Sequence, residues 1–214
     1  MFTGIVETTG LVKTVRGGAG GMALSVDLGK SADGVKVGQS IAVNGVCLTV
    51  SRLVSGRVAE FDVSAETSAV SAMDRIRAGS KVNIERSVSA DGRFGGHFVL
   101  GHVDGIASVR SIEIKGDFAE MTFATAADLL DEMVPKGSVC VDGVSLTVAS
   151  MDEAGFSVSL IPTTLKETTL GQVKVGDVVN IETDIITKTV KKQLARMLPA
   201  KETLSVQRLK ELGF

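Results

Sequence analysis

A hairpin motif occurs twice in this chain of 214 residues, and it constrains the fold more than any other feature. The first copy spans residues 43–50 (VNGVCLTV), and the second spans residues 141–148 (VDGVSLTV). In each copy, alternating apolar residues flank an Asn-Gly or Asp-Gly pair, and such pairs are favoured in two-residue turns that need positive φ. Both copies therefore predict a β-hairpin.

A two-residue loop fixes which side chains share a face of each hairpin. In the first copy, Cys47 and Thr49 share the face away from the core, and the core-facing set is Ile41, Val43, Val46 and Leu48. In the second copy, Ser145 and Thr147 point away from the core, roughly 7 Å apart along one strand, and the core-facing set is Val139, Val141, Val144 and Leu146. A thiol in one copy thus corresponds to a hydroxyl in the other.

The repeat extends over most of the chain at a separation of about 97 residues. Segments 3–7, 61–67 and 78–85 correspond to 100–104, 156–164 and 175–182. Each half has about six short alternating strands and one short helix candidate, at 68–76 or 165–170. We therefore predict an all-β fold of two tandem six-stranded antiparallel Greek-key barrels with a C-terminal helix, because closure removes exposed strand edges. A sandwich remains the structural alternative.

Three ranges follow from this pattern. We expect an N-terminal barrel at 1–95, a C-terminal barrel at 96–186, and a helix with a tail at 187–214. The glycine-rich junction 90–96 predicts either a flexible linker or a tight backbone approach. From 187 to 198 the pattern becomes helical, with an apolar stripe of Val190, Leu194 and Met197 before Pro199. This stripe packs either on its own domain or in an oligomer seam.

Composition excludes several classes of protein. A net charge of -2 argues against a nucleic-acid-binding domain, and no run reaches the roughly 20 apolar residues of a membrane span. The first residues have no signal-peptide pattern, so we expect a cytoplasmic protein. Cys47 and Cys140 are not equivalent in the two copies, which predicts free thiols.

Few residues stand out as chemical groups. His97 and His102 are five residues apart without a thiolate or acidic cluster, so we expect no metal site. Ser145 does not lie in a Gly-x-Ser-x-Gly elbow, which argues against a covalent serine hydrolase. Asp184, after the last strand pattern, either orients a hydroxyl or is an exposed turn residue.

At these motifs the chain closely resembles the riboflavin synthase family, of the trimeric type with two lumazine-binding domains. The matching stretches are the opening MFTGIVE, both hairpin motifs, 95–97 through 101–104, and 160–162. The resemblance implies a dismutation in which one 6,7-dimethyl-8-ribityllumazine donates a four-carbon unit to a second, giving riboflavin and 5-amino-6-(D-ribitylamino)uracil. It implies no metal and no cofactor, and it implies a homotrimer whose active site joins barrels of two subunits. It leaves open an association with lumazine synthase.

The resemblance also implies residue roles. Ser145 and Asp184 would position water or a hydroxyl for addition to one lumazine while the 7-methyl group of the other loses a proton, and His102 and Cys47 would tune the two sites. The implied contacts of the first barrel are Gly4, Ile5, Val6, Cys47, Leu48, Thr49, Asp62, Val63, Ser64, Ala65, Glu66 and Thr67. Those of the second barrel are Gly101, His102, Val103, Lys136, Ser145, Leu146, Thr147, Ser159, Leu160, Ile161, Pro162, Thr163 and Thr164. The alternatives are a non-catalytic lumazine- or flavin-binding protein of the same fold and a barrel scaffold without a small ligand.

Overall fold

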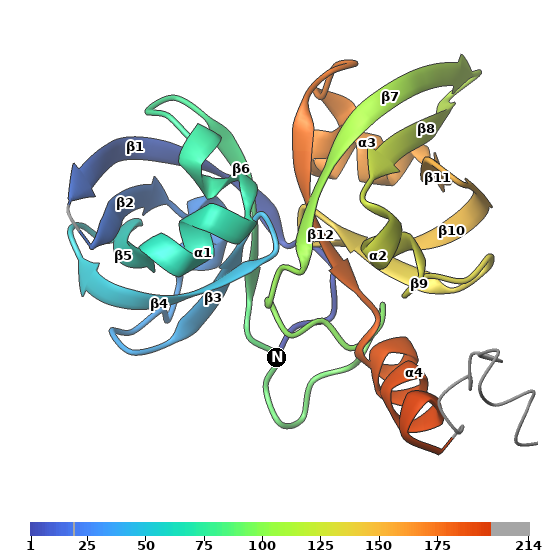
Figure 1. The fold of residues 1–214 in the computed structure, drawn as a ribbon. Coiled ribbons are helices and arrows are strands. Elements are labelled where there is room, and N and C mark those ends of the chain that lie inside the picture. The colour runs from blue at the N-terminus through green and yellow to red at the C-terminus, as the bar shows by residue number, and fades with distance from the viewer. Residues whose placement is uncertain (19, 198–214) are drawn as a thin grey trace, which may run out of the picture.

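The structure is a computed structural model that describes residues 1–18 and 20–197. It contains two closed six-stranded antiparallel barrels that lie side by side, with helix α4 (Ile185–Met197) projecting away from them (Figure 1). The predicted fold class is confirmed, and both barrels close, which rules out the sandwich alternative.

The two barrels have the same topology. The first has the strand order β1-β2-β5-β4-β3-β6, and β6 pairs with β1 to close it. Its strands are β1 (Thr8–Gly18), β2 (Gly21–Asp27), β3 (Ser40–Val43), β4 (Val46–Leu53), β5 (Val58–Ser64) and β6 (Lys81–Arg86). The second follows the equivalent order with β7 (Gly105–Lys115), β8 (Phe118–Thr125), β9 (Ser138–Val141), β10 (Val144–Asp152), β11 (Gly155–Leu160) and β12 (Val178–Thr183).

Short helices connect the strands. After β5 come α1 (Ala65–Val70) and the 3₁₀ helix η2 (Ala72–Arg75), and after β11 come α3 (Pro162–Glu167) and η3 (Thr169–Gly171). Both α-helices begin three residues before the predicted starts, because Ser64 caps α1 by accepting from the Thr67 N–H and Pro162 occupies the first turn of α3. Two further short helices, η1 (Gly29–Ala32) and α2 (Ala127–Leu130), were not predicted.

Both hairpins have the predicted register. In the first, Val43 pairs with Val46 and Ile41 with Leu48. In the second, the matching pairs are Val141 with Val144 and Val139 with Leu146. The turn residues Asn44 and Asp142 both have φ of 46°, followed by glycines with positive φ, as this turn type requires.

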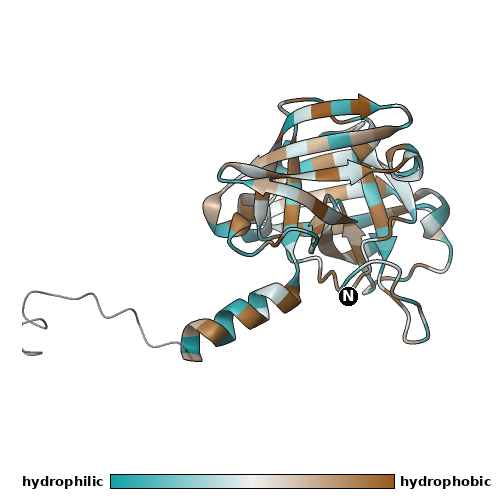
Figure 2. Ribbon diagram, turned by 90° about the vertical axis from the view of Figure 1, so that its right-hand side faces the viewer, coloured by the Kyte–Doolittle hydropathy of each residue, from teal (hydrophilic) through white to brown (hydrophobic). Residues whose placement is uncertain are grey.

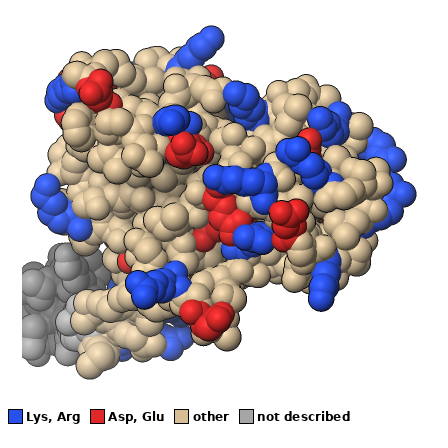
Figure 3. All heavy atoms as spheres, turned by 180° about the vertical axis from the view of Figure 1, so that it is seen from behind, with Lys and Arg blue, Asp and Glu red and all other residues tan. Residues whose placement is uncertain are grey.

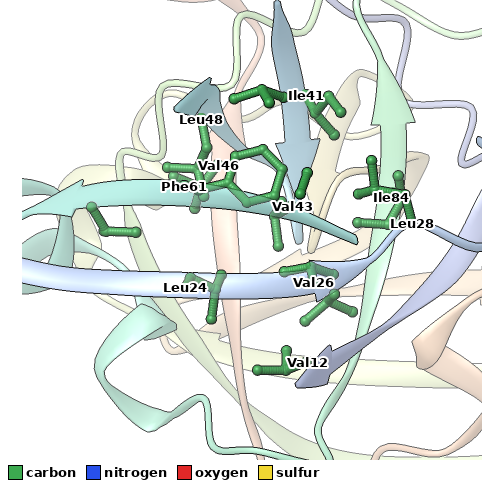
Figure 4. Close-up of a cluster of buried hydrophobic side chains, with 14 of the residues drawn as sticks. Val12, Leu24, Val26, Leu28, Ile41, Val43, Val46, Leu48, Phe61 and Ile84 are labelled. Carbon is green, nitrogen blue, oxygen red and sulfur yellow. The ribbon is translucent and has the colours of Figure 1, made fainter. Parts of the chain in front are cut away.

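Each barrel encloses its own apolar core. In the first, side chains from all six strands converge around Phe61 and Leu24 (Figure 4). The ribbon coloured by hydropathy shows the alternation along the strands that produces this arrangement (Figure 2). In the second barrel, Leu146 is only partly buried against the core, so its side chain is less enclosed than that of its counterpart Leu48.

The chain exchanges two short segments between the barrels. Val6, which precedes the first barrel, packs against the second core, and Val103, which precedes the second barrel, packs against the first. Phe2 and Val99 pair at the crossing, where each backbone N–H donates to the other residue's carbonyl, at 2.7 and 3.1 Å. The exchange follows an approximate twofold relation between the two halves.

Helix α4 presents its apolar stripe to solvent. Val190, Leu194 and Met197 are 51%, 50% and 78% exposed. The described residues therefore leave the stripe uncovered. The predicted tail 198–214 lies outside the described residues. Positive and negative side chains are interspersed on the face in Figure 3, and no described helix has the length and apolar character needed to cross a membrane.

Candidate functional site

The first candidate site surrounds Cys47. A cavity of about 210 Å³ is lined by Val46, Cys47, Glu66, Thr67, Val70, Gly101, His102 and Val103. The Cys47 N–H donates to the Gly101 carbonyl at 2.8 Å. Gly101 has φ of 80°, and a Cβ there would come within 2.5 Å of the Cys47 Cβ, so this approach requires glycine. The site thus combines the first hairpin with the segment that precedes the second barrel.

The second candidate site surrounds Ser145 and is built in the same way. The Ser145 N–H donates to the Gly4 carbonyl at 2.8 Å, and a Cβ on Gly4 would lie 2.6 Å from the Ser145 Cβ. Gly96 also approaches closely, since its Cβ would lie 2.2 Å from the Thr3 carbonyl and 2.8 Å from the Ser145 Oγ. The glycine-rich junction therefore makes a tight backbone approach at Gly96.

The structure corrects the predicted grouping of these segments. The family resemblance implies that Gly4, Ile5 and Val6 lie with the Cys47 hairpin, and that Gly101, His102 and Val103 lie with the Ser145 hairpin. In the structure the two segments are exchanged, because the chain crosses between the barrels before each barrel begins. Each site therefore takes residues from both halves of the chain.

Two buried glutamates hold the crossing segments. Glu85 accepts hydrogen bonds from the Thr3 and Gly4 N–H groups at 2.7 and 3.0 Å. Glu182 accepts from the Leu100 and Gly101 N–H groups at 2.7 and 2.8 Å. Burial raises the pKa of Glu85 and of Glu182, and these hydrogen bonds partly oppose the rise. Each glutamate therefore fixes the segment that one site takes from the other half of the chain.

A polar cluster distinguishes the second site. His97 Nδ1 lies 2.7 Å from the Ser145 Oγ, and His97 Nε2 is buried without a partner among the described residues. Burial lowers the pKa of His97, and the nearby Asp184 carboxylate opposes this shift. Asp184 accepts from the Ile186 N–H at 2.9 Å at the start of α4. His97 therefore contacts Ser145 directly, and the Asp184 carboxylate is near enough to influence the pKa of His97.

His97 is not among the site residues predicted from the sequence. His102 is among the predicted catalytic residues, and it lines the first cavity beside Cys47. In the repeat, the position that matches His102 is Ile5, which is half exposed. The only signal for His97 was its place in the glycine-rich match at 95–97, since its contact with Ser145 depends on the crossing of the chain.

Lys136 has an unusual backbone conformation. Its φ is 68°, and its N–H donates to the Val148 carbonyl at 2.8 Å. The equivalent position in the first copy is Gly38, with φ of 87° and a matching bond to Val50. A lysine where the repeat has glycine carries a conformational cost.

Not every predicted residue turns its side chain toward a site. Leu48, Val63 and Leu160 are buried in the barrel cores, so only their backbone groups can face a ligand. Thr49 and Thr147 are exposed on the outer hairpin faces, as predicted. The remaining predicted residues lie at the ends of β5 and β11 and in the first turns of α1 and α3: Asp62, Ser64, Ala65, Glu66, Thr67, Ser159, Ile161, Pro162, Thr163 and Thr164.

Two other observations delimit the sites. Within the described ranges, no group of three or more His, Cys, Asp or Glu side chains could hold a metal ion. A larger cavity of about 570 Å³ lies between the start of the chain, the end of β6 and the junction, where Arg86 and Arg93 line it. Ser40 of β3 and the residues Thr3 and Ile5 also line it, so this cavity adjoins the N-terminal segment that contacts Ser145.

Comparisons with known proteins agree with this duplicated arrangement. The lumazine-binding domain family matches residues 3–87 and 100–184. Riboflavin synthase of Bacillus subtilis (strain 168) is 41% identical, and the match covers 100% of both chains. Riboflavin synthase of Actinobacillus pleuropneumoniae is 39% identical, again over 100% of both chains.

Solved structures show the same fold with ligands bound. LumP in complex with riboflavin has a TM-score of 0.79 and 26% identity, covering 86% of this chain and 99% of that chain. LumP in complex with 6,7-dimethyl-8-(1'-D-ribityl) lumazine has a TM-score of 0.76 and 25% identity over the same shares. With two lumazine-binding domains and identities near 40% along its whole length, this chain belongs to the riboflavin synthase family.

Proposed function

We propose that this chain catalyses the dismutation of two 6,7-dimethyl-8-ribityllumazine molecules. One molecule donates a four-carbon unit to the other, which gives riboflavin and 5-amino-6-(D-ribitylamino)uracil, and the atoms balance without an external oxidant. The observation that carries the proposal is a pair of matched sites with different polar groups. Cys47 and His102 occur in one, and Ser145 and His97 occur in the other. A matched pair suits two identical substrates, and the difference suits a donor and an acceptor.

The chemistry of the second site follows from its polar cluster. Because burial lowers the pKa of His97, its imidazole is neutral at pH 7 and can accept a proton. At 2.7 Å, its Nδ1 can accept the hydroxyl proton of Ser145, whose oxygen then orients water or a hydroxyl that adds to one lumazine. Asp184 favours the imidazolium that forms, while the 7-methyl group of the other lumazine loses its proton.

Substrate binding uses backbone groups around both hairpins. A flat heterocycle needs a few well-placed polar partners and apolar walls. The hairpin strands, the crossing segments and the first turns of α1 and α3 supply such groups in both halves. The predicted binding residues are thus proposed contacts in two sites, with the crossing segments assigned to the opposite hairpins.

We further propose that three copies assemble through α4 and that the reaction joins the first-barrel site of one copy to the second-barrel site of another. The exposed apolar stripe of Val190, Leu194 and Met197 supports a contact between the α4 helices of different copies. Ile5 and Ile161 are both about half exposed and lie on segments that contribute to the second site. These apolar side chains are suited to contact a neighbouring copy at the entrance of that site. Burying such residues between copies would stabilise the assembly.

The alternative is a lumazine or flavin carrier of the same fold, since the LumP structures hold these ligands. The Ser145–His97 pair favours the enzyme. The test is to mix the purified protein with the lumazine and record flavin absorbance over time. Growing flavin absorbance supports the enzyme, a stable shift of the lumazine spectrum supports the carrier, and an unchanged spectrum supports a scaffold without this ligand.

A further inference from the structure

The two barrels hold their crossing segments with different cations. In the first half, Glu7 pairs with Arg86, the last residue of β6, at 2.9 Å. Asp104 occupies the matching position in the second half, but the residue that matches Arg86 is Thr183, which carries no charge. The cation there is Lys188, which comes from helix α4.

The contact between Lys188 and Asp104 is close and partly shielded from water. Lys188 Nζ lies 2.8 and 2.7 Å from the two carboxylate oxygens of Asp104, and the side chains are 20% and 23% exposed. The Thr183 N–H and hydroxyl also donate to Asp104, at 2.8 and 3.0 Å. Such a charge-assisted network is stronger than an isolated surface ion pair.

Asp104 ends the segment that lines the first site. His102 and Val103 directly precede it, and the Asp104 N–H donates to the Ile181 carbonyl at 2.9 Å. Glu182 holds the beginning of the same segment through the Gly101 N–H. The segment is therefore fixed at both ends, and Lys188 supplies the partner charge at one of them.

The same turn of α4 also meets the second site. The Lys188 N–H donates to the Asp184 carbonyl at 3.1 Å, and Asp184 is the carboxylate near His97. Lys188 precedes Val190 by two residues, which places the two side chains on roughly opposite sides of the helix. The ion pair thus holds one side of α4 to the barrel and leaves the apolar stripe facing outward.

We propose that Lys188 is a positioning residue, which through Asp104 ties the assembly helix α4 to the segment 100–104 of the first ligand site. As a statement about ligand binding, the proposal rests on the proposed function. It predicts that loss of the ion pair loosens the first site even when α4 and both barrels remain folded.

The test uses the thiol of Cys47 as a local reporter in the full chain. Cys47 is partly exposed in the first site, whereas Cys140 is buried and burial raises the pKa of its thiol, so a small alkylating reagent reacts first with Cys47. The rate is measured with and without riboflavin, by mass spectrometry of the Cys47 peptide. Sedimentation and circular dichroism report the assembly and fold of each variant.

We expect Lys188→Met to raise the rate of Cys47 alkylation about three- to tenfold. The riboflavin concentration that halves this rate should rise by a similar factor. Asp104→Asn should reproduce the effect, and Lys188→Arg should restore most of the wild-type rate. The matched control is Lys192→Met, one turn further on the same side of α4 and exposed, which should behave as wild type.

The outcomes separate this proposal from the proposed function. A wild-type protein whose Cys47 is not protected by riboflavin or lumazine contradicts ligand binding at the first site, while the ligand-free rates still decide the role of Lys188. Unchanged rates and unchanged protection in a folded Lys188→Met protein overturn the positioning role. If that variant unfolds, the rates in Asp104→Asn decide by the same criteria.

Discussion

Asn83 and Asn180 make the same pair of hydrogen bonds in opposite directions across the boundary between the barrels. Asn83 Nδ2 donates to the Asp142 carbonyl, and Asn180 Nδ2 donates to the Asn44 carbonyl, both at 2.8 Å. The side-chain oxygen of each accepts a backbone N–H from a 3₁₀ helix of the other barrel. Both asparagines are buried, so these four bonds join the two halves where water is excluded.

Replacing either asparagine should therefore weaken the whole protein. Asn83→Ala removes two hydrogen bonds and leaves a buried carbonyl and a buried N–H without these partners, so we expect a loss of about 2–4 kcal/mol in the free energy of unfolding. Asn180→Ala should cost a similar amount because of the twofold relation. Urea unfolding measures both, and a loss below about 1 kcal/mol in each would show that the boundary does not depend on these bonds.

A second prediction concerns Asp142, which matches the neutral Asn44 of the first hairpin. Burial raises the pKa of Asp142 from 3.8 to about 7. The folded state therefore binds this proton more tightly than the unfolded state, and stability falls as pH rises from about 4 to 7 and is level above. Asp142→Asn should remove this contribution, which amounts to about 3 kcal/mol between pH 5 and pH 8.

The matched control introduces a carboxyl group at Asn44, the position in the first hairpin that matches Asp142. Asn44→Asp should make the protein less stable at pH 8 than at pH 5, beyond the wild-type difference. Urea unfolding of all three proteins at both pH values checks this, and the comparison between variants cancels the contributions of Glu85 and Glu182. If wild type and Asp142→Asn show the same pH dependence, Asp142 is not protonated in the folded protein at pH 5.

A third prediction addresses the polar cluster of the second site. Ser145→Ala should lower turnover by a factor of about 10² to 10³ while the fold survives. His97→Gln should also lower turnover and should remove the acid limb of the pH profile. That limb lies below the usual histidine range because burial lowers the pKa of His97. Ser150→Ala on the same strand, where the hydroxyl contacts Ser157, serves as the control.

A fourth prediction tests why a lysine occupies a left-handed backbone position. Lys136→Gly should keep or raise stability by up to about 1 kcal/mol, since glycine removes the strain at φ of 68°. Activity should nevertheless fall by about tenfold or more if the ammonium group contacts a ligand. Lys136→Ala keeps the strain and should lose the same activity without the gain in stability. Full activity in both variants would contradict a functional role.

The last prediction concerns assembly through α4. Val190 and Leu194 are exposed in the single chain, so Val190→Glu with Leu194→Glu should leave the barrels folded and dissociate the assembly. Sedimentation should give mostly monomer at micromolar concentration, with riboflavin still bound but little flavin formed. Removal of all residues from Lys188 onward should also dissociate it, although that change also removes the Lys188–Asp104 pair. A fully active monomer would show that one chain holds the complete site.

Much of the fold was predictable because it depends on local chemistry. The Asn-Gly and Asp-Gly turns fix the registers of both hairpins, and the repeat then implies two similar barrels. The starts of α1 and α3 were predicted too late, because the cap at Ser64 and the proline at 162 act at positions that continue an alternating strand pattern.

The site was only partly predictable because it depends on the path of the chain between barrels. Cys47 and Ser145 follow from the hairpins alone. The partners of these residues do not, since the exchange of 4–6 and 101–103 is a tertiary feature without a periodic signal. The contact of His97 with Ser145 arises from the same crossing, so the sequence alone does not indicate it.

The exchange of segments between the barrels is the geometry of a symmetric dimer whose subunits swap their first residues. Two separate subunits with the same sequence necessarily form two identical pockets, because any substitution in one subunit also occurs in the other. Joining them in one polypeptide lifts that restriction, so a thiol can occupy one pocket and a hydroxyl the other, and a lysine can replace a glycine on one side alone. Covalent linkage of the halves thus allows two pockets that are built in the same way to carry different side chains.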